Sequence, residues 1–422
     1  MSPESSKVLS FEQACKVVEE HASQLRPRGR ELLSLLDANG RVLAEPITAD
    51  RDFPPFRRAA RDGYAVRAVD LATVPATLAV VGEIRAGAAS EIGRLQRGQA
   101  ASIMTGAAAP DGADAVVMVE HTSRDGARVE VMKSIAAGEN IVPVGSEAKR
   151  GQELLSPGTL LGYAAIALAA ATGRARVVAY ARPRIAVLST GDEIVDIDVP
   201  PGPHQIRNSN SYSLATQIAT AGGAPVLLPI APDEPKRLAE LLQEGLEADL
   251  LLIAGGVSMG KYDLVEQVLA DLKAEFFFTG AKIQPGKPIV FGAVPYGAGA
   301  PARENNSENG IKYFLGLPGN PISTMVCFEL FAQPLIEALA GLQPRKLVFV
   351  HAQLKTTIKT KLGLKRFLPA QLSGEFENSE VELVPWQGSG DLASMARSNC
   401  YIVIPPDRES IPAGEFVPVL LR

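Results

Sequence analysis

Clusters of glycine, carboxylate and amide residues follow several short apolar runs in the second half of this 422-residue chain. The run RIAVLS leads into TGDE, DLLLIA leads into GGVSMG, and YFLGL leads into PGNP. Glycines let backbone N–H groups approach a ligand closely, and helix N-termini favour anions. Carboxylates would repel a phosphate unless a hard cation such as Mg²⁺ lies between them. The pattern therefore predicts a phosphorylated ligand bound with a divalent metal ion.

The candidate residues lie at the ends of predicted strands, where open α/β sheets bind their ligands. They are Ser189, Thr190, Gly191, Asp192 and Glu193 after the first strand, Asp233 after the second, Gly255, Gly256, Ser258 and Asp263 after the third, and Gly316, Pro318, Gly319, Asn320 and Pro321 after the last. Asn208, Ser209 and Asn210 are expected to form the N-cap of a helix at the same edge. Each loop alone is also typical of an ordinary turn, but four loops at successive strand ends favour a binding site.

Three further segments hold candidate side chains outside these loops. Asp62 lies in RDGYAVR, Thr105 lies in SIMTGAAAP, and Ser389 lies in WQGSGDLASMARSNC. In the last segment Ser394 and Arg397 are further candidates to hold an oxyanion. A tight turn or a capped loop is the alternative interpretation of each segment.

The segment GAKIQPGKP offers two cations but is not a nucleotide P-loop. Its glycine spacing is wrong, and Pro288 stands where a P-loop has the Ser or Thr that contacts Mg²⁺. Lys282 and Lys287 remain candidates for anion binding, with solvated surface lysines as the alternative.

The overall composition excludes several classes of protein. With a net charge of −5 and no basic block, the chain is expected to bind neither nucleic acid nor an anionic membrane. Three widely spaced cysteines predict no disulfide framework and a cytoplasmic location, and four scattered histidines give no basis for a zinc site. The N-terminus has no apolar segment typical of a signal peptide. The apolar stretch 160–172 is shorter than the roughly 20 residues that span a bilayer, so a buried helix is expected there.

The composition and the expected secondary structure change along the chain, which predicts several domains. Ser10 and Gln13 predict a capping box at the start of a first helix. Short β-prone runs separated by Gly, Pro and Asp turns predict a β-rich module over 49–143, inserted between helical segments. A helix over 160–172, with Gly173 at its C-cap, follows that module. Alternating strands and helices over 182–343 predict a mostly parallel sheet covered on both faces, and a β-rich domain follows from 344 to 422.

Local sequence signals predict a helix cap and a surface loop in the α/β region. Asp233 is expected to cap a helix that has Pro235 in its first turn. The polar stretch 298–310 is expected to be a surface loop.

The motifs together resemble the molybdopterin molybdenumtransferase family, of the MoeA type that includes the E domains of gephyrin and plant homologues. The matching stretches are DGYAVR, IMTGAAAP, GSEAKRG, LSTGDEIV, QIRNSNSY, GGVSMGKYD, QPGKP, GLPGNPIS and QGSGDLASMA. They follow the order of the family and cover nearly the whole chain.

The resemblance implies a multidomain α/β plus β fold in four parts. These are a helical dimerisation domain (1–48 and 144–181), an inserted β-rich domain (49–143), a doubly wound α/β molybdopterin-binding domain (182–343) and a C-terminal β-barrel domain (344–422). It further implies a homodimer with the active site between subunits. The implied reaction is Mg²⁺-dependent insertion of molybdate into adenylylated molybdopterin, which releases AMP and forms the molybdenum cofactor. The implied partners are the molybdopterin adenylyltransferase and the enzymes that accept the cofactor.

The resemblance also assigns roles to individual positions. The residues implied in catalysis are Asp62, Thr105, Glu193, Asp233, Asp263 and Lys287, and those implied in metal binding are Glu147, Glu193, Asp233 and Asp263. The loops that hold Gly255, Gly256, Ser258, Gly316, Pro318, Gly319 and Asn320 correspond to loops that contact the pterin nucleotide. Lys287 and Ser389 correspond to the region that handles molybdate.

Four positions depart from the usual pattern of the family. The segment FRRAARDGYA is arginine-rich, which either strengthens anion attraction or marks a subgroup. Glu147 stands where Asp is commoner, a conservative change for metal contact. Gln284 replaces a common Lys and removes one cation from the oxyanion site. Pro369 stands where many relatives carry Arg, and Arg366, three residues earlier, is expected to point elsewhere.

Two other functions compete with the transferase. A molybdopterin adenylyltransferase would share the α/β domain, but the β insertion and the C-terminal barrel argue against it. A carrier or scaffold that binds molybdopterin or its cofactor without turnover is the other alternative, and binding without AMP release would distinguish it.

Overall fold

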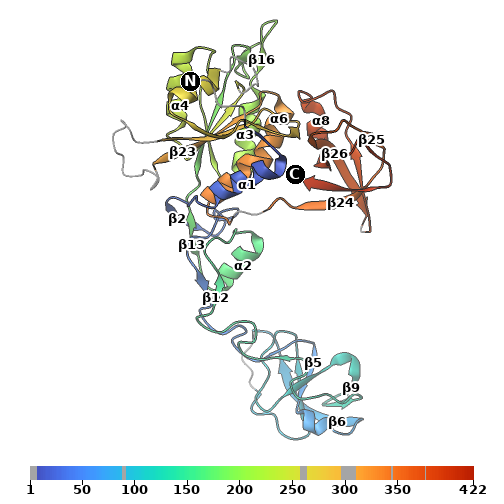
Figure 1. Ribbon diagram of the computed structural model, residues 1–422. Coiled ribbons are helices and arrows are strands. Elements are labelled where there is room, and N and C mark those ends of the chain that lie inside the picture. Colours follow the sequence, from blue (N-terminus) through green and yellow to red (C-terminus); the bar gives the residue numbers. More distant parts are fainter. Residues whose placement is uncertain (1–6, 88–91, 257–263, 296–309, 344–345, 376) are drawn as a thin grey trace. The chain divides into compact units, whose positions relative to one another are not determined.

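The computed structural model describes residues 7–87, 92–256, 264–295, 310–343, 346–375 and 377–422 (Figure 1). The chain forms two compact units. We call Leu33–Asn39 with Glu45–Val177 the insertion unit, and Met1–Leu32, Gly40–Ala44 and Val178–Arg422 the α/β–barrel unit. The paired strands β2 (Arg30–Ser34) and β13 (Arg176–Tyr180) lie where the chain passes from one unit to the other.

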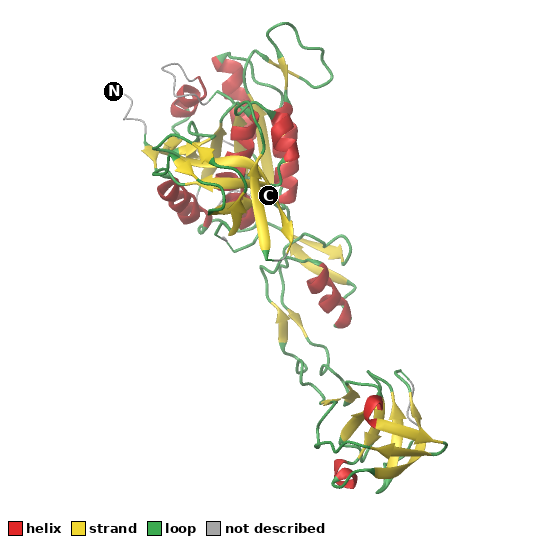
Figure 2. Ribbon diagram, turned by 90° about the vertical axis from the view of Figure 1, so that its right-hand side faces the viewer, coloured by secondary structure: helices red, strands yellow, loops and turns green. Residues whose placement is uncertain are grey.

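The insertion unit is built on a six-stranded sheet with the order β8-β5-β7-β6-β10-β9, which confirms the predicted β-rich module (Figure 2). Its strands are β5 (Gly63–Val66), β6 (Ala76–Ile84), β7 (Gln99–Ile103), β8 (Ala115–Met118), β9 (Thr122–Asp125) and β10 (Arg128–Val131). Shorter elements are β3 (Ile47–Thr48), β4 (Arg58–Ala59), β11 (Ile141–Val142), β12 (Glu153–Leu155) and the 3-10 turns η1 (Ala68–Leu71) and η2 (Val119–His121). Alternate residues of β5 enter different apolar clusters, Ala65 on one side and Tyr64 and Val66 on the other.

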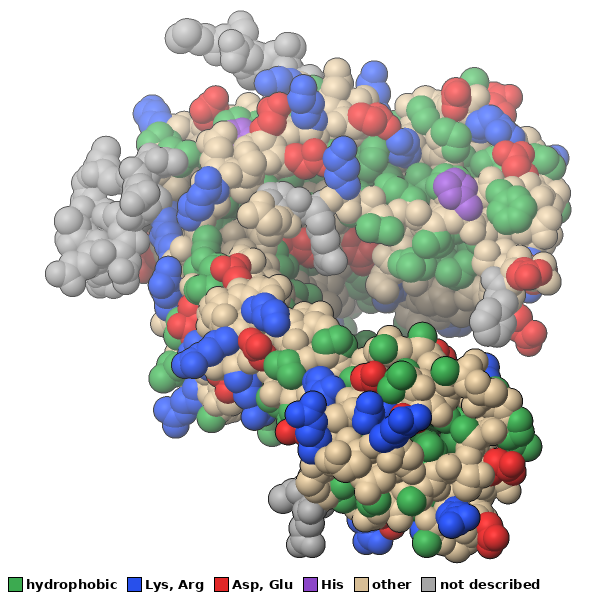
Figure 3. Space-filling model, turned by 90° about the horizontal axis from the view of Figure 1, so that it is seen from below, with side chains coloured by type: hydrophobic (Ala, Val, Ile, Leu, Met, Phe, Trp, Pro, Cys, Tyr) green, Lys and Arg blue, Asp and Glu red, His purple; other side chains and the backbone are tan. Residues whose placement is uncertain are grey.

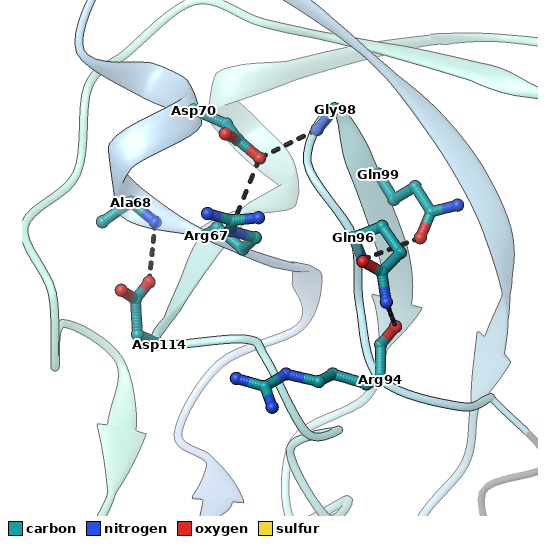
Figure 4. A network of polar contacts seen from close by, with 8 residues as sticks. All are labelled: Arg67, Ala68, Asp70, Arg94, Gln96, Gly98, Gln99 and Asp114. Carbon is teal, nitrogen blue, oxygen red and sulfur yellow. Dashed lines mark hydrogen bonds and ion pairs between the residues drawn. The ribbon is translucent and has the colours of Figure 1, made fainter.

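Two aspartates fix the segment that follows β5 (Figure 4). The Ala68 backbone N–H donates to Asp114 at 2.6 Å, and the Gly98 N–H donates to Asp70 at 2.9 Å. Asp70 also forms an ion pair with Arg67, at 3.9 Å between Nε and Oδ2. Arg67, the last residue of the RDGYAVR motif, is therefore part of the contacts that hold the segment after β5.

The apolar stretch 160–172 forms the helix α2 (Tyr163–Ala171), but the prediction that this helix is buried is wrong. Only Ala169 is buried within the helix, and the Tyr163 side chain is 90% exposed. Gly173 follows the C-cap in a left-handed conformation, with φ of +77°, as expected for the end of a helix.

The α/β–barrel unit contains the predicted mostly parallel sheet, with the order β17-β14-β18-β23-β22-β19. β17, β14, β18 and β23 are parallel, whereas β22 runs antiparallel to both of its neighbours, β23 and β19. The strands are β14 (Arg184–Ser189), β17 (Ala224–Leu227), β18 (Leu250–Ala254), β19 (Glu275–Phe278), β22 (Val290–Pro295) and β23 (Ile311–Leu317). Short strands beside the sheet are β1 (Val8–Leu9), β15 (Ile194–Val195), β16 (Ile206–Arg207), β20 (Gly280–Ala281) and β21 (Ile283–Gln284).

Helices cover both faces of this sheet, as predicted. The helices are α1 (Phe11–Ala22), α3 (Ser209–Thr220), α4 (Pro235–Gly245), α5 (Leu264–Asp271), α6 (Pro321–Cys327), the π-helical turn η3 (Phe328–Ala332) and α7 (Gln333–Leu339). Ile185 and Val187 of β14 pack with α1, α3, α6 and α7, whereas Ala186 and Leu188 pack with α4 and α5. The alternation of a central strand thus builds two cores.

Three details differ from the sequence-based expectations or limit them. Helix α1 has the predicted capping box, and its buried side packs with the α/β core. The N-cap of α4 is Glu234 and not Asp233, because Pro235 takes the first helical position. Most of the predicted surface loop over 298–310 lies outside the described residues.

The helix from Pro321 to Leu339 is the one described segment that is long and apolar enough to cross a membrane. Most of this segment (78%) is buried inside the fold, as expected for a helix of the α/β core.

The C-terminal region is a small β-barrel, also as predicted. The strand order is β21-β26-β27-β24-β30-β28, and pairing of β26 with β28 closes the barrel. Its elements are β24 (Phe349–Leu354), β25 (Ile358–Lys359), β26 (Lys365–Glu375), β27 (Asn378–Leu383), α8 (Leu392–Arg397), β28 (Cys400–Ile404), β29 (Ser410–Ile411) and β30 (Phe416–Leu421).

Candidate functional site

Four of the predicted loops meet at one edge of the α/β sheet. β17, β14, β18 and β23 are neighbouring parallel strands, so their carboxyl ends lie side by side. We call the segments after them (190–193, 231–234, 255–256 and 318–321), together with 208–210, the strand-end loops. Ligands of such sheets bind at this edge.

Hydrogen bonds fix the loop after β14 to its two neighbours. The Thr190 backbone N–H donates to the Ala254 carbonyl at 3.1 Å, and the Gly191 N–H donates to the Ala231 carbonyl at 3.1 Å. Asp192 accepts from the Asp233 N–H at 3.1 Å, which confirms that Asp192 shapes the turn. Glu193 and Asp233 both have exposed side chains at this edge.

Asn208 begins helix α3 and joins it to the end of β14. The side chain of Asn208 accepts from the Ser211 backbone N–H at 3.1 Å, so the predicted N-cap is confirmed. The Ser189 hydroxyl lies 3.1 Å from Asn208 Oδ1 and 2.9 Å from the Ser211 hydroxyl. All three side chains are buried, and together they hold the start of α3 against the strand. The role of Ser211 was not predicted, although the NSNS motif contains it.

Close backbone approaches bring the remaining loops together. The Asn210 side chain donates to the Gly319 carbonyl at 2.7 Å, which connects the start of α3 to the loop after β23. A Cβ atom on Gly256 would lie 2.7 Å from Thr190 Oγ1, and one on Gly319 would lie 3.6 Å from the Gly255 Cα. Gly256 also has a φ of +64°, which glycine adopts readily.

Two buried polar atoms at this edge have no hydrogen-bond partner among the described residues. They are Thr190 Oγ1 and Asn210 Oδ1. Buried polar groups are normally hydrogen-bonded, so unused capacity at a strand edge is typical of a site that accepts a polar ligand.

The segments that carry Lys287 and Ser389 both contact α6, which begins at this edge. The Ile322 backbone N–H donates to the Ser389 carbonyl at 2.9 Å. Lys287 is exposed, and the preceding Gly286 packs against Cys327 of α6, whose thiol lies 3.5 Å from the Gly286 carbonyl. The segments of Lys287 and Ser389 thus contact the same helix, the Ser389 segment at its first turn and the Lys287 segment at its last residue.

The two other candidates for oxyanion binding near the QGSGDLASMA segment differ in their exposure. Ser394 is buried, and its hydroxyl donates to the Asp391 carbonyl at 2.7 Å, so Ser394 serves the cap of α8. The Arg397 side chain is exposed in the last turn of α8.

Arg366 is a basic residue near this region whose position the sequence did not predict. Parallel pairing of β21 with β26 places Arg366 directly beside Gln284, in the QPGKP segment. The Arg366 guanidinium donates to the Leu364 carbonyl at 3.0 Å, and burial lowers its pKa. Only the strand pairing reveals that Arg366 is a neighbour of Gln284.

The predicted metal ligands are not gathered into a cluster in the described part of the chain. Over the described residues no group of three or more His, Cys, Asp or Glu side chains is placed to hold a metal. Glu193 and Asp233 lie at the strand-end edge, whereas Asp263 lies outside the described residues. Ser258, which was predicted to contact the pterin nucleotide and not the metal, also lies outside them. Glu147 belongs to the insertion unit, where it accepts a hydrogen bond from Arg58 at 2.7 Å. The carboxylate oxygens at the edge are nevertheless the donors that Mg²⁺ prefers.

Asp62 and Thr105 are brought together in the insertion unit. β5 pairs antiparallel with β7, so the residue before β5 meets the turn after β7. Asp62 Oδ1 accepts from the Thr105 backbone N–H at 2.6 Å and from its hydroxyl at 3.0 Å. The hydrogen bond from the Thr105 backbone is the main cause that lowers the pKa of the exposed Asp62 carboxyl. Figure 3 shows Lys and Arg side chains gathered on part of the surface of this unit.

The remaining predicted site residues have different positions. Ser209 is the first residue of α3 and Pro321 is the first of α6, with Asn320 as its N-cap. Pro318 accepts a hydrogen bond from Thr324 through its carbonyl. Gly316 is buried inside β23, paired with β18 and β22, and is part of the strand.

Three family models match successive parts of this chain. They are the MoeA N-terminal region (domain I and II) over residues 9–173, a probable molybdopterin binding domain over 186–338, and the MoeA C-terminal region (domain IV) over 351–421.

Curated proteins and solved structures with the same family names match over most of their length. A molybdopterin molybdenumtransferase of Nostoc sp. is 37% identical over 399 residues, which cover 92% of this chain and 88% of that protein. The Bacillus subtilis protein of that name is 32% identical over 400 residues, which cover 93% of this chain and 89% of that protein. A crystal structure of a molybdopterin biosynthesis MoeA protein from Pyrococcus horikoshii aligns with a TM-score of 0.71 at 32% identity. The alignment covers 98% of this chain and 99% of that chain. The chain therefore belongs to the molybdopterin molybdenumtransferase (MoeA) family.

Proposed function

We propose that this protein is the transferase that inserts molybdenum into adenylylated molybdopterin, with release of AMP and formation of the molybdenum cofactor. The observation that carries the proposal is the meeting of four strand-end loops at one edge of the α/β sheet. Curated relatives that cover most of the chain have the name molybdopterin molybdenumtransferase, which supports the same reaction.

The strand-end loops would bind the pterin nucleotide. Gly256 and Gly319 are exposed at this edge, and the N-terminal end of α3 favours an anionic group. Thr190 and Asn210 supply polar atoms that no described residue uses. These groups would orient the nucleotide before the reaction and contribute through positioning.

Negative charge is the main obstacle to this reaction, because dianionic molybdate must approach a ligand that already carries phosphates. Lys287 and Ser389 would hold the molybdate, since both lie in segments that contact α6. Arg366, beside Gln284, adds a cation near the position where relatives have a lysine. Fixed cations and hydrogen-bond donors of this kind stabilise developing negative charge.

The carboxylates at this edge would hold Mg²⁺. Glu193 and Asp233 are exposed there, and Asp263 is the third predicted ligand. When bound, the ion would supply Lewis-acid neutralisation of charge on the departing phosphate. No covalent protein nucleophile is needed, which agrees with a chain that has no serine–histidine or cysteine–histidine signature.

We further propose a homodimer in which Asp62, Thr105 and Glu147 of one subunit complete the site of the other. The support is the exposure of an apolar helix: α2 has the sequence YAAIALAAA, yet Ala169 is its only buried residue. Large exposed apolar surfaces are typical of protein–protein contacts.

The cellular setting follows from the substrate and from the thiols. An adenylyltransferase must supply adenylylated molybdopterin, and molybdenum enzymes must accept the product, so both are proposed partners. Cys15, Cys327 and Cys400 are free thiols, which supports a reducing cytoplasm.

Turnover with purified components tests the proposal. The protein should convert adenylylated molybdopterin and molybdate into cofactor and AMP in the presence of Mg²⁺, and chelation with EDTA should stop AMP release. Binding of the substrate without AMP release would instead favour a carrier. Glu193→Ala and Asp263→Ala should each lower turnover, and unchanged rates in both would mean that the metal site lies elsewhere.

A further inference from the structure

Two adjacent arginines in the segment FRRAARDGYA of the insertion unit are held in different ways. Arg57 Nη1 donates to the Ala113 carbonyl at 2.9 Å, and its Nη2 donates to the Pro110 carbonyl at 3.3 Å. Arg58 instead contacts a side chain, with 2.7 Å between its Nη2 and Oε1 of Glu147. Arg57 therefore serves the backbone of its own unit, whereas Arg58 is paired only with another charged side chain.

The backbone of Arg58 is fixed on both sides. The strand β4, which contains Arg58, lies between β11 and the segment that follows Thr105. Arg58 pairs with Val142 of β11 and with Ala108 on the other side. The Gly106 N–H, next to Thr105, also donates to a carbonyl of β4 at 2.8 Å. The guanidinium of Arg58 therefore extends from a fixed position beside the turn that carries Thr105.

Glu147 is held by backbone contacts of its own. The Glu147 and Ala148 N–H groups donate to the Phe53 carbonyl at 2.9 and 3.1 Å, and the Phe53 N–H donates to the Ala148 carbonyl at 2.9 Å. A carboxylate fixed in this way orients the guanidinium that it contacts. The side chain of Arg58 is 36% exposed, and its remaining N–H donors have no acceptor among the described residues. Those donors are available to a ligand.

The charges around this pair favour an anion over a metal ion. Basic side chains outnumber acidic ones in the two segments that meet here, with Arg51, Arg57, Arg58, Arg61, Lys149 and Arg150 against Asp52, Asp62 and Glu147. Figure 3 shows Lys and Arg side chains gathered on this unit, although the whole chain has a net charge of −5. A Mg²⁺ ion would have to compete with a guanidinium already bonded to Glu147, and carboxylates free of such a partner suit it better. Glu147 therefore does not fit the metal-binding role that the family resemblance implies.

We propose that Arg58 binds an oxyanion of the substrates, either molybdate or a phosphate of the nucleotide, and that Glu147 is a positioning residue that orients the Arg58 guanidinium. The planar fork of arginine matches the oxygens of such anions. This inference deepens the proposed function and rests on the proposed completion of the site by the insertion unit. An ordinary exposed ion pair, which contributes little to stability, is the alternative that the experiments exclude or support.

Equilibrium dialysis with AMP and with molybdate tests the role of Arg58. Arg58→Ala should weaken the binding of one of these ligands by about tenfold, as expected for a lost charge-assisted hydrogen bond, and the ligand that responds identifies the oxyanion. Arg58→Lys keeps the charge without the fork and should lose less. Arg128→Ala removes an exposed arginine of β10 in the same unit and should bind as the wild type does. Unchanged affinity of Arg58→Ala for both ligands, or a wild type that binds neither, would overturn the proposal.

Variants of Glu147 test whether this residue acts through Arg58. Glu147→Gln keeps a hydrogen-bond acceptor, so its affinity for the responding ligand should lie between those of the wild type and Glu147→Ala. Adding Glu147→Ala to Arg58→Ala should cause no further loss, because the two changes remove the same interaction. The Mg²⁺ concentration that gives half-maximal AMP release should be the same in Glu147→Ala and the wild type. A higher Mg²⁺ requirement, or a further loss in the double variant, would contradict the positioning role.

Reversing the pair separates binding from a purely structural contact. The double variant Arg58→Glu with Glu147→Arg keeps an ion pair at this place, so its midpoint of urea unfolding should stay close to that of the wild type. Its affinity for the responding ligand should fall at least as far as in Arg58→Ala, because a carboxylate then occupies the position of the guanidinium. A reversed pair that binds as the wild type does would show that the contact is only structural.

Dialysis does not require turnover, so failure of this proposal can be distinguished from failure of the proposed function. No AMP release by a wild type that binds AMP and molybdate would refute the proposed reaction. Equal affinities of the wild type and Arg58→Ala, in a protein that does release AMP, would refute the role of Arg58 alone.

Discussion

Asp62 holds the turn that contains Thr105 although the two residues lie 43 positions apart in the chain. Both hydrogen bonds reach the same oxygen, Oδ1, and they favour the ionised form of the carboxyl. Because the pKa of Asp62 is lowered, its contribution to stability is present above the unfolded value of 3.8 and is lost as the pH falls through the folded value. At neutral pH the pair is therefore intact and exposed.

Asp62→Ala should lower kcat/KM for AMP release by about tenfold or more, because the turn of Thr105 loses its anchor and the proposed site loses a carboxylate. Thr105→Ala keeps the backbone bond and should have a smaller effect. Asp125→Ala removes an exposed aspartate of the same unit and serves as the control. An Asp62→Ala enzyme with the activity of the control would remove this residue from the site.

Gly286 and Cys327 fix the backbone before Lys287 by direct contact. A Cβ atom on Gly286 would lie 2.3 Å from the Cys327 sulfur, and Gly286 has a φ of +105°. Gly286→Ala should therefore destabilise the protein by about 1–3 kcal/mol and displace Lys287. The measurement is urea unfolding together with the KM for molybdate.

The double variant Gly286→Ala with Cys327→Ala removes the clash but keeps the backbone strain. It should be more stable than the sum of the two single changes predicts, since residues in contact show coupling. Additive free energies of unfolding would show that the contact does not position this segment.

Among the secondary-structure elements, α2 shows the largest difference between what its sequence indicates and where it lies. Its run of apolar residues is typical of a core helix, yet Tyr163 is 90% exposed and the nearby Leu160 is 51% exposed. Local composition indicates that such a helix needs an apolar partner but does not say whether the partner belongs to the same chain.

Tyr163→Glu should shift the protein towards the monomer, because it places a charge on the apolar face proposed for the dimer. Analytical ultracentrifugation over a range of concentrations measures the shift. Gln243→Glu changes an exposed residue of α4 and should leave the association unchanged. A variant at Tyr163 that associates as the wild type does would exclude α2 from the interface.

At the scale of the whole molecule, each unit has buried clusters of its own. Leu78 belongs to a core of the insertion unit, and Leu241 belongs to the core between the sheet and α4 in the α/β–barrel unit. Domains with separate cores can unfold in separate steps.

Calorimetry should accordingly show two unfolding transitions. Leu78→Ala and Leu241→Ala should each cost about 3 kcal/mol, and each should shift one transition and leave the other nearly unchanged. A single transition that both variants shift equally would mean that the two units unfold together.

Much of the fold could be predicted from the sequence, because hydrophobic periodicity and turn residues act locally. The capping box of α1, the N-cap at Asn208, the mostly parallel sheet and the β-rich C-terminal domain followed from such signals. The predicted cap at Asp233 was wrong because Pro235 moved the helix start, so that Asp233 stayed in the strand-end loop.

The sequence alone determined which residue types are available at the strand ends, since glycines, carboxylates and amides follow each apolar run directly. It did not determine which of them touch. The bonds from Asp62 to Thr105, from Asn210 to Gly319 and from Ile322 to Ser389 join segments far apart in the chain. Such pairs depend on strand order and register, which are set when the whole chain buries its apolar surface. Only the tertiary structure therefore decided that the loops after four separate strands form one edge.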